Sequence, residues 1–210
     1  MAIAMGARSV SMERHAIPKI MRGKFSVLLP DVLIQKGIKM ALYEFAVIAE
    51  GLDPKSDDFE ARFYRAGCDD ATIAFQRGVI IVDFSRESNS LEEAIHSAVE
   101  AVRATGATVI RVEPEPLVSL SDIAERAGLT KAAISLYARG QRGSGFPHPV
   151  ARVTTDSPLW NWADIAKWLN ATGKLDQQAV AEAALIASIN SDLAGLKNIS
   201  REIDRGSAIP

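Results

Sequence analysis

The stretch that most constrains the fold covers residues 120–140 and reads LSDIAERAGLTKAAISLYARG. Apolar residues recur at helical spacing on both sides of Gly128, which predicts two short helices separated by a tight turn. Gly128 suits that turn because glycine adopts a positive φ at little cost. Ser119 or Ser121 can cap the first helix, and Thr130 can cap the second. We therefore expect a compact helical hairpin here.

The side chains of this hairpin divide into a contact side and an outward side. Helices that cross closely need a small residue at the contact, and Ala124 supplies one. The small core between the helices would consist of Ile123, Ala127, Leu129, Ile134 and Tyr137. The second helix, residues 130–139, would direct outward Lys131, Ala132, Ser135, Leu136 and Arg139. Short side chains and hydrogen-bond donors suit a helix that enters the major groove of DNA. The stretch therefore predicts a helix-turn-helix.

A basic segment follows the hairpin. Residues 139–155 hold three arginines and His148 but no acid. Gly143 and Gly145 predict a flexible tip, and residues 150–154 alternate as a strand does. A further helix is expected to begin at residues 156–158, with an apolar side made of Trp162, Ile165, Ala166 and Leu169. The tryptophans are expected to fill core and cap positions rather than to stack on bases.

With this segment the sequence resembles the winged helix-turn-helix units of the MerR, excisionase and AlpA-like group. Those units join a hairpin to a G-x-F-P-x-P-V wing and to a helix with the pattern D-I-x-x-W-L. The matching residues are Gly145, Phe146, Pro147, Pro149 and Val150, then Asp164, Ile165, Trp168 and Leu169. The resemblance covers residues 119–170, a quarter of the chain, and implies DNA binding by helix 130–139 and the wing. MerR-type units usually stand at the N-terminus, whereas this one follows a separate domain, and the cysteines of metal-sensing members are absent.

These features lead to a hypothesis of function. We expect a sequence-specific transcriptional regulator that binds double-stranded DNA. The candidate groove contacts are Thr130, Lys131, Ala132, Ser135 and Arg139. The candidate contacts to phosphates or to the minor groove are Arg142, His148 and Arg152. The alternative is an adaptor or antitoxin-like protein that binds a protein partner and uses the hairpin for autoregulation.

Residues 40–116 alternate between strand and helix patterns in the order β-α-β-β-α-β. This is the split βαβ arrangement of ferredoxin-like domains. We therefore predict an α+β fold, with a ferredoxin-like domain before an all-α winged helix-turn-helix (residues 117–172) and a C-terminal helix (173–210). One sheet face would pack against both helices, and the other would stay open to a protein partner, a second copy or a small ligand. The stiff Glu-Pro-Glu-Pro connector, residues 113–116, marks the domain boundary.

The sequence gives little support for enzyme chemistry. The acid pairs at 57–58 and 92–93 stand in the first turns of predicted helices, where carboxylates offset the positive end of the helix dipole. No Gly-rich phosphate loop, nucleophile motif or HExxH motif occurs. Cys68 is the only cysteine, and the three histidines are scattered, namely His15, His96 and His148. We expect no enzyme activity, no cofactor and no metal site, and a reduced cytoplasmic setting.

Charge is distributed unevenly behind a net value of −2. Residues 1–40 carry seven Lys and Arg against two acids, residues 41–118 seven against fifteen, and residues 119–172 six against four. A pI near 6.0 therefore does not argue against contact with nucleic acid. For residues 1–39 two interpretations stay open: Met40 is the natural start, or a poorly ordered basic arm lies on DNA. That segment lacks the apolar length of a membrane span and the features of a secretory signal.

The C-terminal residues 175–205 predict one helix with apolar residues at spacings of three and four, namely Ile186, Ile189, Leu193, Leu196 and Ile203. The pattern is too short for a long coiled coil. We expect the helix to mediate a homodimer contact, because two copies can bind two half-sites on DNA. The alternative is an amphipathic helix that packs on its own chain.

Overall fold

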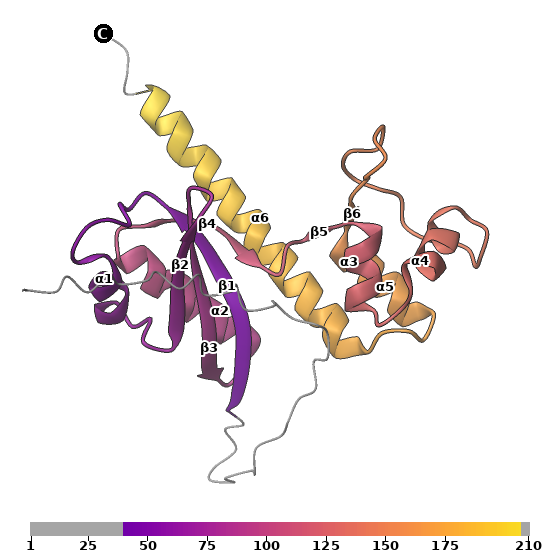
Figure 1. Ribbon diagram of the computed structural model, residues 1–210, viewed down its shortest axis with the longest axis horizontal. Coiled ribbons are helices and arrows are strands. Elements are labelled where there is room, and N and C mark those ends of the chain that lie inside the picture. The colour runs from indigo at the N-terminus through magenta and orange to yellow at the C-terminus, as the bar shows by residue number, and fades with distance from the viewer. Residues whose placement is uncertain (1–39, 207–210) are drawn as a thin grey trace, which may run out of the picture.

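The computed structural model describes residues 40–206, and their side chains as far as residue 195 (Figure 1). The predicted basic arm, residues 1–39, lies outside the described residues. The first unit contains β1 Ala41–Glu50, α1 Phe59–Arg65, β2 Ala71–Gln76, β3 Val79–Ser88, α2 Leu91–Ala104 and β4 Thr108–Glu113. Its fold is mixed α+β, with an antiparallel sheet in the order β2-β3-β1-β4. The strands and helices of this unit follow one another in the order β-α-β-β-α-β, and residues 53–59 form turns before α1 begins at Phe59.

The core of this unit lies on one face of the sheet. Phe45 stands opposite Phe84, and Val47 opposite Val82, so alternate residues of β1 and β3 point to the same side. There they pack against α1 and α2, whose buried residues include Phe63 and Ile95. Burial of these apolar side chains supplies the main driving force for folding. The opposite face of the sheet carries exposed acids, among them Glu44, Asp83 and Glu87.

Arg86 links β3 to the turn after α1 through hydrogen bonds. Its Nε and Nη2 donate to the two carboxylate oxygens of Asp70 at 2.7 and 2.8 Å, and Nη2 also donates to the Gly67 carbonyl at 2.7 Å. Nη1 donates to Ser97 Oγ of α2 at 3.1 Å, while the guanidinium lies 4.6 Å from the centre of the Phe84 ring. The hydrogen bond to the Asp70 carboxylate is the main cause of a raised pKa of Arg86. One side chain therefore links three segments that are distant in sequence.

The second unit consists of β5 Leu117–Val118, α3 Leu120–Arg126, α4 Lys131–Ala138, β6 Trp160–Asn161 and α5 Trp162–Ala171. It is not all-α as predicted, because β5 and β6 form a short antiparallel pair. Residues 156–158 do not begin a helix; α5 begins at Trp162, where the Asn161 side chain accepts hydrogen bonds from the backbone N–H groups of Ala163 and Asp164. Ser119 rather than Ser121 caps α3, in a capping box with Asp122.

The last helix, α6 Gln177–Gly206, packs on both units (Figure 1). Near its start, small residues of α5 and α6 meet, including Ala166 and Ala183. Further along, α6 covers the outer edge of β4, where Asn190 Nδ2 donates to the Val112 carbonyl at 2.9 Å and Asn190 Oδ1 accepts from the Val112 N–H at 2.7 Å. The Asn190 amide thus takes the place of a neighbouring strand.

This packing corrects the predicted role of the C-terminal helix. Ile186, Ile189 and Leu193 belong to the core of the first unit, so these residues are buried by their own chain. The alternative of an amphipathic helix packed on its own chain therefore holds over the described side chains of α6. The two remaining residues of the predicted contact, Leu196 and Ile203, have side chains outside the described part. Across residues 40–206, no helix has both the length and the apolar character that crossing a membrane requires.

Candidate nucleic-acid interface

The helix α4 has one buried side and one outward side, as the sequence predicted. Ile134 and Tyr137 are buried against α3 and α5, and Gly128 has the expected positive φ of 63° in the turn before α4. The Thr130 hydroxyl accepts a hydrogen bond from the Ala133 N–H at 3.2 Å and so caps the helix. Lys131 and Ala132 are exposed at the first turn of α4. The start of this helix is therefore accessible to a ligand.

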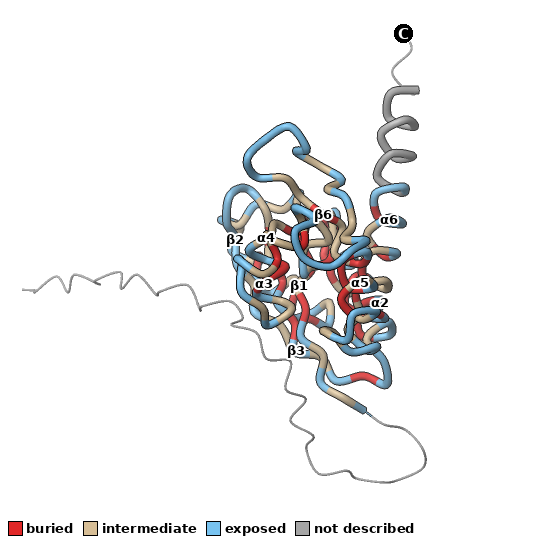
Figure 2. Tube along the Cα trace, turned by 90° about the vertical axis from the view of Figure 1, so that its right-hand side faces the viewer, coloured by how far each residue is buried: buried red, intermediate tan, exposed pale blue. Residues whose placement is uncertain are grey.

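The candidates at the end of α4 are arranged differently. Ser135 is half-buried, and Arg139 is exposed but directs its Nε back to the Ser135 carbonyl at 3.2 Å. Residues 139–145 are all exposed where the chain leaves the helix (Figure 2). The N–H groups of Gln141 and Arg142 bond to the Leu136 carbonyl at 2.9 and 3.2 Å, so this loop turns back over the helix end. Arg142 is thus held close to α4.

The loop after α4 is anchored, which corrects the prediction of a flexible tip at Gly143 and Gly145. Trp168 Nε1 donates to the Ser144 carbonyl at 3.0 Å, and Trp160 Nε1 donates to the Pro147 carbonyl at 3.1 Å. Gly143 has a φ of 68°, and a Cβ there would stand 3.4 Å from the Tyr137 ring. Glycine suits this position because of the left-handed backbone conformation, while a Cβ would only touch the Tyr137 ring.

An aromatic cluster lies beneath this loop. The Trp168 ring is 4.9 Å from the Tyr137 ring and 5.0 Å from the Phe146 ring, both edge to face. Two cations lie near the Tyr137 ring, the Arg142 guanidinium at 5.2 Å and the Lys174 ammonium at 5.5 Å. Sequence reasoning assigned the tryptophans to core and cap positions, but it missed Lys174, which lies far along the chain from α4. These contacts place positive charge over the rigid cluster.

The predicted strand at 150–154 is reduced to a single bridge between Ala151 and Leu159. Arg152 has a φ of 51° and begins a turn, in which its carbonyl accepts from the Thr155 N–H at 3.0 Å. A β-strand cannot continue through a residue with positive φ. Residues 152–157 are therefore an exposed loop that carries Arg152, and His148 is exposed before the bridge. The residues that match the wing pattern, 145–150, come before this loop, and the Val150 N–H bonds to the Leu159 carbonyl at 2.7 Å.

Arg126 is a structural residue that the sequence analysis did not identify. Its Nη2 donates to the Glu115 carbonyl at 2.9 Å, and its guanidinium lies 5.2 Å from the centre of the Trp162 ring. Burial lowers the pKa of Arg126, against the opposing effect of the nearby Asp122 and Glu115. The side chain fixes the connector, residues 113–116, to the second unit. It is therefore not available as a contact to DNA.

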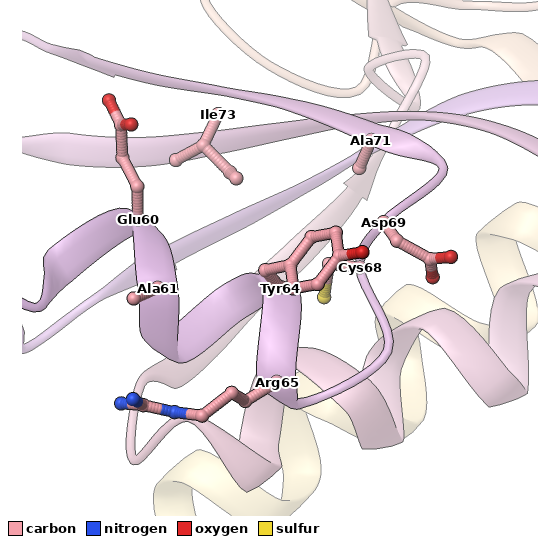
Figure 3. A pocket seen from close by; sticks show the side chains of 8 residues that line it. All are labelled: Glu60, Ala61, Tyr64, Arg65, Cys68, Asp69, Ala71 and Ile73. Atoms are coloured by element: carbon pink, nitrogen blue, oxygen red, sulfur yellow. The ribbon is translucent and has the colours of Figure 1, made fainter.

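The first unit offers a weaker candidate site. A shallow hollow lies between α1 and the free edge of β2, lined by Glu60, Ala61, Tyr64, Arg65, Cys68, Asp69, Ala71 and Ile73 (Figure 3). The Cys68 thiol beneath it is buried, and burial raises its pKa to about 11, which makes it a poor nucleophile. Within the described residues, no group of three His, Cys, Asp or Glu side chains is placed to hold a metal ion. The hollow has no arrangement of groups that indicates catalysis.

No protein-family model, curated protein or solved structure matches this chain. The candidate interface therefore depends on the geometry of α4 and of the loops that follow it.

Proposed function

We propose that this protein is a sequence-specific DNA-binding regulator that inserts α4 into the major groove. On this proposal the second unit is a winged helix-turn-helix of the kind found in the MerR, excisionase and AlpA-like group, and the first unit is a ferredoxin-like domain for sensing or oligomerisation. The observation that carries the proposal is that α4 has an exposed first turn and is followed, at its other end, by an anchored loop that carries Arg142. A helix that is packed on its apolar side and exposes its first turn can enter the major groove and contact base edges.

The candidate contacts have different expected roles. Lys131 and Ala132 are exposed in the first turn of α4, and Ser135, one turn further on, is half-buried. We assign all three to base edges and the groove wall. Arg142 is held over the aromatic cluster, and we assign it to a phosphate. Because its loop is anchored, little conformational entropy is lost when the guanidinium binds. His148 and Arg152 would contact the backbone or the minor groove beyond α4.

Selection of bound fragments from a genomic DNA pool, followed by titration of the selected fragment, tests the proposal. We expect Arg142→Ala to weaken binding to all sequences and to lower the slope of log K against log salt by about one. Lys131→Ala and Ser135→Ala should instead change the preferred sequence. Lys55→Ala is the matched control, because Lys55 is an exposed cation of the first unit.

Two results would contradict this proposal. The first is a salt slope for Arg142→Ala equal to that of the Lys55→Ala control, which would remove the loop from the interface. The second is no enrichment of any fragment together with co-purification of a protein in stoichiometric amount. In that case the adaptor or antitoxin-like alternative would replace the regulator.

A further inference from the structure

The outer edge of β2 is an open strand edge of the first unit. Such edges are normally protected by charged residues, proline or a bulge, because they can pair with another strand. The strand β2 reads ATIAFQ and has none of these features. By contrast, α6 and the Asn190 amide cover β4 at the other edge of the sheet. Only one of the two sheet edges is therefore closed within the described residues.

The hydrogen-bond pattern shows which groups of β2 face outward. The Ser85 N–H bonds to the Asp70 carbonyl, so Asp70 and Ser85 are a hydrogen-bonded pair. Thr72 and Ala74 lie two and four residues further along β2 and therefore also bond to β3. In an antiparallel pair, hydrogen-bonded and non-hydrogen-bonded positions alternate. The backbone N–H and C=O groups of Ile73 and Phe75 therefore point away from β3, and no described residue bonds to them. They are available to an added strand.

The same edge combines an exposed aromatic side chain with a hollow. Phe75 is 46% exposed near the end of β2, and Tyr64 is 71% exposed on α1. The hollow beside Tyr64 is lined by the small side chain of Ala71 and by Ile73 (Figure 3). Side chains directly opposite each other in paired strands lie on the same face of the sheet. A strand added at this edge would thus direct every second side chain into the hollow.

The charges that flank β2 are self-complementary. Asp69 stands two residues before the strand and Arg77 directly after it. Both are exposed, and neither forms a salt bridge within the described residues. If two β2 strands pair antiparallel about an axis at Ile73, Asp69 of each copy lies beside Arg77 of the other. In this register Phe75 of one copy stands opposite Ala71 of the other, where the hollow is. This register also pairs odd-numbered residues with each other, and these are the residues whose backbone groups point away from β3.

We propose that the β2 edge is the interface between two copies of this chain, which join their sheets across a two-fold axis at Ile73. The interface is isologous, because the same aromatic side chain, hollow and charge pair occur on both copies. This inference goes beyond the DNA-binding proposal and does not depend on it. It replaces the C-terminal helix as the dimer contact, and it leaves α4 of both copies free.

The solution mass of the full chain, measured without DNA by light scattering and sedimentation, tests this interface. One chain has a mass of 22.6 kDa, and the measured mass in solution should be twice that value. Phe75→Lys should give a monomer, because two buried ammonium groups would replace the aromatic contacts. Leu42→Lys is the matched control, since Leu42 is also apolar and 56% exposed but lies on the opposite sheet face. Thermal melts followed by circular dichroism check that each variant folds.

A charge exchange supplies the decisive measurement. Asp69→Arg alone and Arg77→Asp alone should each weaken the dimer about tenfold, because an attraction between exposed charges becomes a repulsion at two places. The two substitutions together should restore it. Aspartate is tolerated at position 77, where φ is 53°. A monomeric wild-type chain overturns the proposal, as does a double variant that stays as weak as the single ones, or a Leu42→Lys variant that dissociates like Phe75→Lys.

Discussion

Replacement of Arg86 by methionine should destabilise the first unit strongly. Methionine keeps the length of the side chain over Phe84 but leaves the Asp70 carboxylate without its two hydrogen bonds. Removal of one partner from a fully buried ion pair costs about 3–5 kcal/mol. The Arg86 side chain is 12% exposed but Asp70 is 30% exposed, so water recovers part of that cost. We therefore expect a loss of about 2–3 kcal/mol, which lowers the Tm by roughly 5–10 °C in a chain of this size.

Urea unfolding followed by far-UV circular dichroism measures this loss, and a double-mutant cycle isolates the pair. Arg86→Met together with Asp70→Asn should cost less than the sum of the single changes, because no unpaired charge remains. The matched cycle uses Arg103 and Glu100, a pair with side chains 39% and 71% exposed, and its coupling should be close to zero. If the coupling energy between Arg86 and Asp70 is no larger than that of this control pair, the proposed contribution of Arg86 to stability is refuted.

Three further outcomes follow from the described contacts. Alkylation of Cys68 should be slow in the native protein and fast in urea, since burial raises its pKa to about 11; rapid native labelling would contradict its burial. Asn190→Ala should cost about 1–3 kcal/mol and speed hydrogen exchange at the Val112 amide; an unchanged exchange rate would show that α6 does not close the edge. Partial desolvation at the sheet surface and the nearby Glu113 and Glu44 raise the pKa of Asp83, so the folded state favours its protonated form. Stability should therefore fall as the pH rises from the pKa of Asp83 in the unfolded chain to its pKa in the folded protein. Asp83→Asn should stabilise the protein at neutral pH but not at strongly acidic pH. Midpoints of urea unfolding at the two pH values would measure this difference.

The order of elements in the first unit was predictable because local signals agreed with the fold. Ser90 stands directly before the apolar helical pattern of α2, and its side chain caps that helix. The Arg77-Gly78 turn joins β2 to β3, although β3 continues to Ser88. Thr130 and Gly128 likewise mark the turn of the second unit. In each case a few adjacent residues determine the conformation.

The errors arose where distant residues decide the conformation. Gly143 and Gly145 predict mobility in isolation, but the indole groups of Trp160 and Trp168 hold the loop between them. The apolar pattern of α6 fits either a dimer contact or an intrachain one, since a period of three and four does not identify the covering surface. The β4 edge provides that surface, together with a backbone partner for Asn190. Neither contact has a local sequence signal.

The two proposals are connected through α6. This helix packs on α5 of the second unit and on β4 of the first, so it connects the two units. If the sheets join at β2, the order β2-β3-β1-β4 places both α6 helices at the outer edges of a continuous sheet. The two α4 helices would then be separated by the width of that sheet and held by α6. The spacing of the DNA half-sites would be a property of the first unit, and Phe75→Lys should therefore abolish the spacing preference while a single half-site is still bound.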